Sequence, residues 1–172
     1  EDAIGILEQE RVGVPDNDSI VFTQVFRNEY AYDDGTAEKA YGLTTGGGKL
    51  AMRFDLAIAD TLHGLAIHFT PYYDQQTNLN FFLRAWDDDG GQPGDELGEH
   101  YQFHQPAYFT DGHDVFAYYA YDDPIPVEGT VYVGMVQEYE FALNLGLDKN
   151  TDYNFSRLYY QLGLGAEWTL ST

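Results

Sequence analysis

Hydrophobic and polar residues alternate over short stretches of this chain, with a period of two rather than the longer period of a helix. The clearest stretch is residues 130–137, T-V-Y-V-G-M-V-Q, in which Val131, Val133 and Met135 share one face. Residues 80–86, N-F-F-L-R-A-W, alternate in the same way. Successive side chains of a strand point to opposite faces, so both stretches predict β-strands.

Turn-forming residues separate further stretches of this kind at short intervals. Pro124 and Pro126 mark an extended edge segment, because proline cannot donate to a sheet ladder. No long helical period is present, so the pattern predicts an all-β fold, an antiparallel two-sheet β-sandwich that is jelly-roll-like. We expect the other strands at residues 19–26, 49–54, 62–69, 97–103, 115–121, 143–147, 157–161 and 168–170.

The chain is long enough for one domain with a real hydrophobic core. Residues 1–18 are polar and acidic and end in P-D-N-D, so we expect a linker or lead-in segment there. Residues 19–172 then form a single β-sandwich domain, with no internal repeat and no second boundary.

Composition adds constraints on partners. The formal charge is −21, from 8 Lys plus Arg against 29 Asp plus Glu. Such a charge repels nucleic acid and anionic lipid, so neither is an expected partner. There is no Cys and no apolar run of about 18 residues, which argues against disulfides, thiol chemistry and membrane insertion.

Two acidic turns are candidate calcium sites, because Ca²⁺ prefers roughly six to eight oxygen ligands. Each turn also fits an alternative interpretation, in which Asp side chains accept hydrogen bonds from the turn's own backbone. The second turn lacks the ligand spacing of an EF-hand. The first turn contains Asp33 and Asp34, and the second contains Asp87, Asp88, Asp89 and Asp95.

Histidines do not suggest a metal site. His100 and His104 are four residues apart, a ligand spacing on a helix. On a strand that spacing separates them by about 13 Å, too far for one zinc ion.

The aromatic content, with 15 Tyr, 11 Phe and 2 Trp, suits strands and also suggests a glycan-binding platform. Candidate ligand-binding residues are Trp86, Tyr72 and Tyr73, with further tyrosine pairs at 118–119 and 159–160. Core packing explains such residues too, and adjacent side chains of a strand point to opposite faces.

Catalytic motifs are absent: the chain has no nucleophile elbow, phosphate loop, zinc-protease motif or dinucleotide fingerprint. Pairs of carboxylates arise by coincidence among 29 acidic residues and do not identify a glycoside hydrolase. We therefore expect a non-enzymatic protein, with a glycoside hydrolase as the remote alternative.

Four motifs, from Phe22 to the end of the chain, resemble in order and spacing a β-sandwich module of secreted multidomain Bacteroidota proteins. They are Y-D-D-G-T-A-E at 32–38, W-D-D-D-G-G-Q-P-G at 86–94, G-T-V-Y-V-G at 129–134 and L-N-L-G-L-D-K-N at 143–150. Those proteins often have a C-terminal signal for the type IX secretion system. The resemblance implies a secreted or outer cell-surface location and brings no catalytic residues.

The family's module ends with one more apolar strand, so we expect this chain to lack its last strand after Thr172. An open sheet edge would then recruit other domains of the same polypeptide or a protein partner. The expected function is a non-catalytic accessory module for adhesion or glycan targeting, with polysaccharide as ligand and Ca²⁺ as a stabilising ion. The alternative is a structural or cargo domain of a type IX secretion substrate that binds a protein partner.

Overall fold

The computed structural model describes residues 4–6, 22–24, 29–32, 37, 39–71, 77–109, 115–148 and 155–171. Contacts divide the chain into two units, Glu1–Ala31 and Tyr32–Thr172. In the first unit, β1 (Ile4–Ile6) pairs antiparallel with β2 (Phe22–Gln24). The sequence analysis divided the chain after residue 18. The contacts divide it after residue 31, and β2 pairs with β1.

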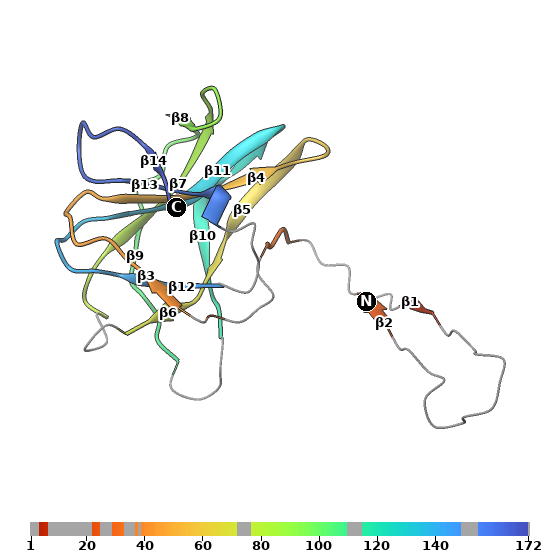
Figure 1. The fold of residues 1–172 in the computed structure, drawn as a ribbon, viewed down its shortest axis with the longest axis horizontal. Coiled ribbons are helices and arrows are strands. Elements are labelled where there is room, and N and C mark those ends of the chain that lie inside the picture. Colours follow the sequence, from red (N-terminus) through yellow and green to blue (C-terminus); the bar gives the residue numbers. More distant parts are fainter. Residues whose placement is uncertain are drawn as a thin grey trace. The chain divides into compact units, whose positions relative to one another are not determined.

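The second unit contains a seven-stranded antiparallel sheet, called here the larger sheet (Figure 1). The strand β7 lies next to the central strand of this sheet. Two short strands pair with the other edge of β7, at different positions along its length. In order across the sheet the strands are β14 (Thr169–Leu170), β13 (Leu158–Gln161), β4 (Lys49–Asp55), β11 (Thr130–Gln137) and β7 (Phe81–Asp88), followed by β8 (Pro93–Glu96) and β9 (Phe103–His104).

The remaining strands of this unit form the second layer. The strands β5 and β6 follow each other along the chain as one extended segment that is interrupted at His68. The carbonyl of His68 accepts from the amide of Gly146 at 2.8 Å. That segment pairs with β10 at its start and with β12 at its end, and β12 also pairs with β3. The bounds are β3 (Lys39–Tyr41), β5 (Asp60–Ile67), β6 (Phe69–Thr70), β10 (Ala117–Val127) and β12 (Asn144–Leu147).

The connections alternate between the layers. From β3 onward the chain passes to β4 in the larger sheet, to β5 and β6 in the second layer, and then to β7. The pairs β5–β10, β4–β11 and β3–β12 enclose one another along the sequence. Nested antiparallel pairs of this kind wrap the chain around itself, so the predicted all-β, jelly-roll-like sandwich is confirmed.

The core lies between the two layers. Phe81, Leu83 and Ala85 of β7 are buried there, as the alternation along that strand predicts. The second layer contributes Phe69 and Tyr119 to the same cluster. Apolar burial on this scale drives the two layers together.

Helices contribute little. A single 3₁₀ turn, Phe155–Arg157, occurs in the described ranges. Within those ranges no helix has the length and apolarity needed to cross a membrane.

The sequence analysis missed three of the described strands: β1, β3 and β8. Pro93–Glu96 reads as part of a turn, yet it forms β8 and returns along β7, with Trp86 opposite Glu96. Proline is tolerated because β8 is an edge strand and Pro93 is its first residue. The strand predicted at 97–103 is reduced to Phe103–His104.

Replacing Leu83 by Ala is expected to lower the free energy of unfolding by about 2–5 kcal/mol, because Leu83 is 1% exposed and the change leaves a cavity. Leu164→Ala is the matched control, since Leu164 is 95% exposed, and should change stability by less than about 0.5 kcal/mol. Urea unfolding followed by fluorescence measures both. Equal losses would contradict the placement of the core.

Candidate functional site

The outward side of the larger sheet concentrates basic residues. On β4, Leu50 and Phe54 face the core, so Lys49 and Arg53 face outward. Alternation along β7 likewise directs Arg84 outward. We call Lys49, Arg53, Arg84 and Arg157 the basic face. They are four of the five lysines and arginines among the described residues, Lys39 being the fifth.

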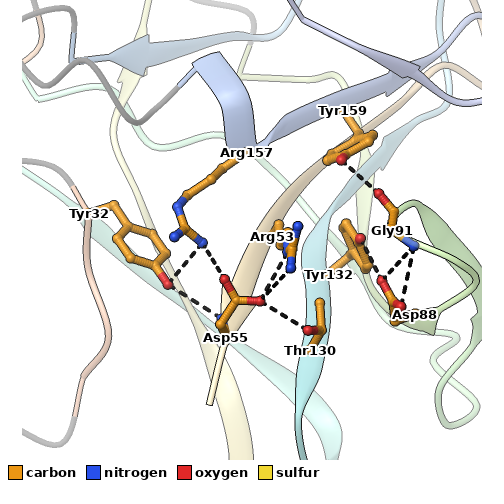
Figure 2. A network of polar contacts seen from close by, with 9 residues as sticks. All are labelled: Tyr32, Arg53, Asp55, Asp88, Gly91, Thr130, Tyr132, Arg157 and Tyr159. Atoms are coloured by element: carbon orange, nitrogen blue, oxygen red, sulfur yellow. Dashed lines mark hydrogen bonds and ion pairs between the residues drawn. The ribbon is translucent and has the colours of Figure 1, made fainter. Parts of the chain in front are cut away.

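Two arginines of the basic face share one carboxylate (Figure 2). Asp55 Oδ1 accepts from Arg53 Nε at 3.0 Å and lies 2.9 Å from Arg53 Nη2. Asp55 Oδ2 accepts from Arg157 Nη1 at 2.8 Å. The hydroxyl of Thr130, on neighbouring β11, donates to Asp55 Oδ1 at 2.9 Å.

Tyr32 closes this group from a distant part of the sequence. Its hydroxyl accepts from Arg157 Nη1 at 3.2 Å, and the guanidinium carbon of Arg157 lies 4.2 Å from the Tyr32 ring centroid. The hydrogen bond from Arg157 is the main cause that lowers the pKa of Asp55, and Thr130 and Arg53 lower it further against the effect of burial. Asp55 is therefore charged at neutral pH and holds both arginines.

A second group of the basic face forms around Glu96 of β8. Arg84 Nε lies 3.1 Å from Glu96 Oε2, and Lys49 Nζ lies 3.6 Å from Oε1. Lys49 Nζ is also 5.9 Å from the centroid of Trp168, which packs edge-on against Trp86. The two groups are alike in having two bases for one acid.

In the acidic β7–β8 turn, two of the predicted calcium ligands, Asp87 and Asp88, accept hydrogen bonds through their carboxylates. Asp87 Oδ1 accepts from the backbone amide of Asp95 at 2.6 Å. Asp88 Oδ1 accepts from the hydroxyl of Tyr132 at 2.8 Å and from the amide of Gly91 at 3.2 Å (Figure 2). Asp89 closes the turn through its own amide, which donates to the carbonyl of Gln92.

The contacts of Asp87 and Asp88 correspond to the turn interpretation, and calcium binding by Asp87, Asp88, Asp89 and Asp95 stays a prediction. Within the described ranges, no three His, Asp or Glu side chains gather in a way that could hold a metal ion. Asp33 and Asp34 lie outside the described residues, and a calcium site there stays a prediction.

Of the three predicted ligand-binding aromatics, only Trp86 is described. It is 1% exposed and packs with Tyr132 and Tyr159 beneath the outward side of the larger sheet. A buried ring has no face to offer a sugar, so Trp86 acts as a support for the surface above it. Tyr72 and Tyr73 lie outside the described residues.

An exposed aromatic surface lies instead on the outward side of the second layer. Tyr118 is 63% exposed, whereas the next residue, Tyr119, is buried in the core, as strand alternation requires. The Tyr118 ring lies over Gly64, since a β-carbon on Gly64 would come within 2.8 Å of Tyr118 Cζ. Phe116, also exposed, lies against His68 with ring centroids 5.8 Å apart.

Small residues surround these rings. From the strand registers and burial pattern, the described residues around Tyr118 on this side include no Asp, Glu, Lys or Arg as far as Ala120. Asp122 follows on the same side of β10. We call this set the aromatic face. It consists of Ala40, Gly64, Ala66, His68, Phe116, Tyr118, Ala120 and Gly146.

The sequence contained signals for both faces. The stretch K-L-A-M-R-F-D at 49–55 already puts Lys49, Arg53 and Asp55 on one side of a strand. Arg157 could not be assigned to that side, because its contact with Asp55 spans 102 positions. The tyrosine pair 118–119 was identified, but which ring faces solvent depends on which side of β10 the core occupies.

A shallow hollow of about 290 Å³ lies beside the irregular part of β10, where the register with β5 shifts between Ala120 and Ile125. It is lined by residues 97–100 and 123–126. The hollow has Glu99 and Asp123 among its lining residues but no described arrangement of nucleophile and base.

Comparison of the chain with protein-family models, with curated proteins and with solved structures gives no match.

Replacing Asp55 by Asn is expected to reduce stability at pH 7 by up to about 1 kcal/mol, a small effect because the carboxylate is 41% exposed. The pKa of Asp55 is lower in the folded state, so its stabilisation exists above the unfolded pKa of about 3.9. It disappears as pH falls through the folded pKa. Urea unfolding at several pH values should show the two proteins converging in acid.

Asp123→Asn removes the same charge from an exposed position on β10 and is the control for that comparison. It should track the wild-type protein at every pH. A difference between wild type and Asp55→Asn that stays the same size as the pH is lowered from 7 into the acid range would refute the role given to the Asp55 charge.

Asp88→Ala is expected to cost about 1–3 kcal/mol, because it leaves the hydroxyl of Tyr132, a residue with 0% exposure, without its acceptor. Adding Tyr132→Phe should recover part of that loss by removing the unpaired hydroxyl. Unfolding is measured with Ca²⁺ and with a chelator. A cost that appears only with Ca²⁺ would identify Asp88 as a metal ligand instead.

Proposed function

We propose that this β-sandwich is a non-catalytic accessory module that binds neutral glycans at the cell surface or outside the cell. The observation that carries the proposal is the aromatic face, an exposed set of residues without Asp, Glu, Lys or Arg, on a chain with a net charge of −21. A cluster of this kind is unexpected on such a chain unless a neutral partner covers it.

The chemistry of the aromatic face suits sugar rings. A pyranose stacks its C–H groups on the face of an aromatic ring. The Tyr118 ring has one side on Gly64 and 63% of its surface exposed, so its other side is available to a flat ligand. Ala66 and Ala120 beside it leave room for a chain of sugars to pass.

Several features support a binding role over catalysis. The carboxylates of Asp55, Asp88 and Glu96 are each held by hydrogen bonds or ion pairs. The resemblance to modules of type IX secretion substrates supports a secreted or surface location. A module of that kind would bring a neighbouring domain to a polysaccharide.

Binding of soluble neutral glucans, mannans and xylans, measured by titration calorimetry, tests the proposal. Tyr118→Ala should weaken binding about tenfold, or about 1.4 kcal/mol, because the stacking ring is lost. Tyr118→Phe keeps the ring and should bind nearly as well as wild type. Both substitutions are at an exposed position, and thermal melting confirms that the fold is retained.

Tyr101→Ala is the matched control, since Tyr101 is 76% exposed and lies off the aromatic face. It should leave the affinity unchanged. The proposal is wrong if no neutral glycan binds, or if Tyr101→Ala and Tyr118→Ala weaken binding equally. Running the melts with Ca²⁺ and with a chelator also tests the predicted stabilising ion.

A further inference from the structure

We infer that the basic face is a second binding surface, which takes an acidic polysaccharide bearing carboxylates. This surface belongs to the larger sheet, whereas the aromatic face belongs to the second layer, so the two surfaces share no residue. The inference therefore does not depend on the proposed binding of neutral glycans.

Charge neutralisation alone does not require the basic face. On a chain with 29 acidic residues, a lysine or arginine meets an acidic partner almost anywhere on the surface. Four of the five described bases nevertheless lie on one side of one sheet, on β4, on β7 and just before β13. A cluster of basic residues on a strongly acidic chain indicates that these bases have a role at that surface.

In the ion pairs of the described residues, each group of the basic face has two bases for one acid. Arg53 and Arg157 share Asp55, and Lys49 and Arg84 share Glu96. An arginine has five N–H donors, and among the described residues Asp55 takes only two donors of Arg53 and one of Arg157. Donors therefore remain for a carboxylate of a ligand.

The two groups are separated along the strand. Lys49 and Arg53 are four residues apart on β4, a distance of about 13 Å. Two positively charged groups at that spacing fit a polymer with anionic groups along its length better than they fit a single small anion. Trp168, half-buried and 5.9 Å from Lys49 Nζ, offers a ring edge for a sugar beside one of them.

The spacing of charges along an anionic polymer decides which class of polymer the basic face can bind. Duplex nucleic acid has one charge per roughly 1.7 Å, so the −21 chain would be strongly repelled along its length. At physiological salt, repulsion between the acidic residues of the protein and an anionic polymer is screened beyond about 8 Å. Attraction by the nearby bases therefore dominates the interaction with a polymer whose charges are widely spaced. A uronate polysaccharide meets this condition.

Polygalacturonate and its fully methyl-esterified form are the test ligands, since they share a backbone and differ in charge. Affinity electrophoresis at about 0.15 M salt, where repulsion by the rest of the chain is screened, should retard the protein with the acid form and much less with the ester. Arg157→Gln and Lys49→Gln should each weaken binding about fivefold, while Arg157→Lys, which retains the charge, should retain most of it.

Lys39→Gln is the matched control, because it removes the fifth described base, which lies on β3 of the second layer. It should bind like wild type, and melting curves verify that every variant is folded. The inference is overturned if the ester binds as well as the acid, if Lys39→Gln loses as much affinity as Arg157→Gln, or if duplex DNA binds better than polygalacturonate. Loss of neutral-glycan binding in Tyr118→Ala is read separately and leaves this result unaffected.

Discussion

The central strand β11 is hydrogen-bonded to β4 on one edge and to β7 on the other, and its pleat serves two environments at once. Val133 and Met135 enter the core between the layers, while Tyr132 enters the cluster on the opposite side, against Trp86. Because the period is two, a slip of one residue would exchange the two sets. The register of β11 is therefore the constraint on which both the core and the basic face depend.

The basic face follows from that register. Thr130 on β11 lies opposite Asp55 on β4, which lets its hydroxyl donate to the carboxylate that holds two arginines. Arg157 arrives at Asp55 through β13, the other neighbour of β4. Glu96 arrives beside Arg84 because β8 folds back along β7. Each charged group therefore forms only when several strands are correctly paired. Its charges lie on the outward side of the sheet, away from the core.

The sandwich gives its two outward sides different chemistry. One side combines bases with their shared acids over a buried aromatic support, and the other exposes a tyrosine among small residues without charge. Small residues are required there: at Gly64 a side chain would collide with Tyr118, and at Gly146 it would collide with His68 and Ala37. The two surfaces lie on different layers of the sandwich and share no residue.

The sequence by itself determined the all-β class and most strand positions from 49 to 170. It also determined that Lys49, Arg53 and Asp55 lie on the same side of one strand. Both follow because period-two alternation is a local property. The sequence also identified the acidic turn that contains Asp88. Only the tertiary structure decided that Trp86 is a buried support, that Pro93–Glu96 forms a strand, and that Arg157 joins Asp55. Alternation says which side chains share a face, but only the packing of strands distant in sequence decides whether that face is core or surface, and which partners meet there.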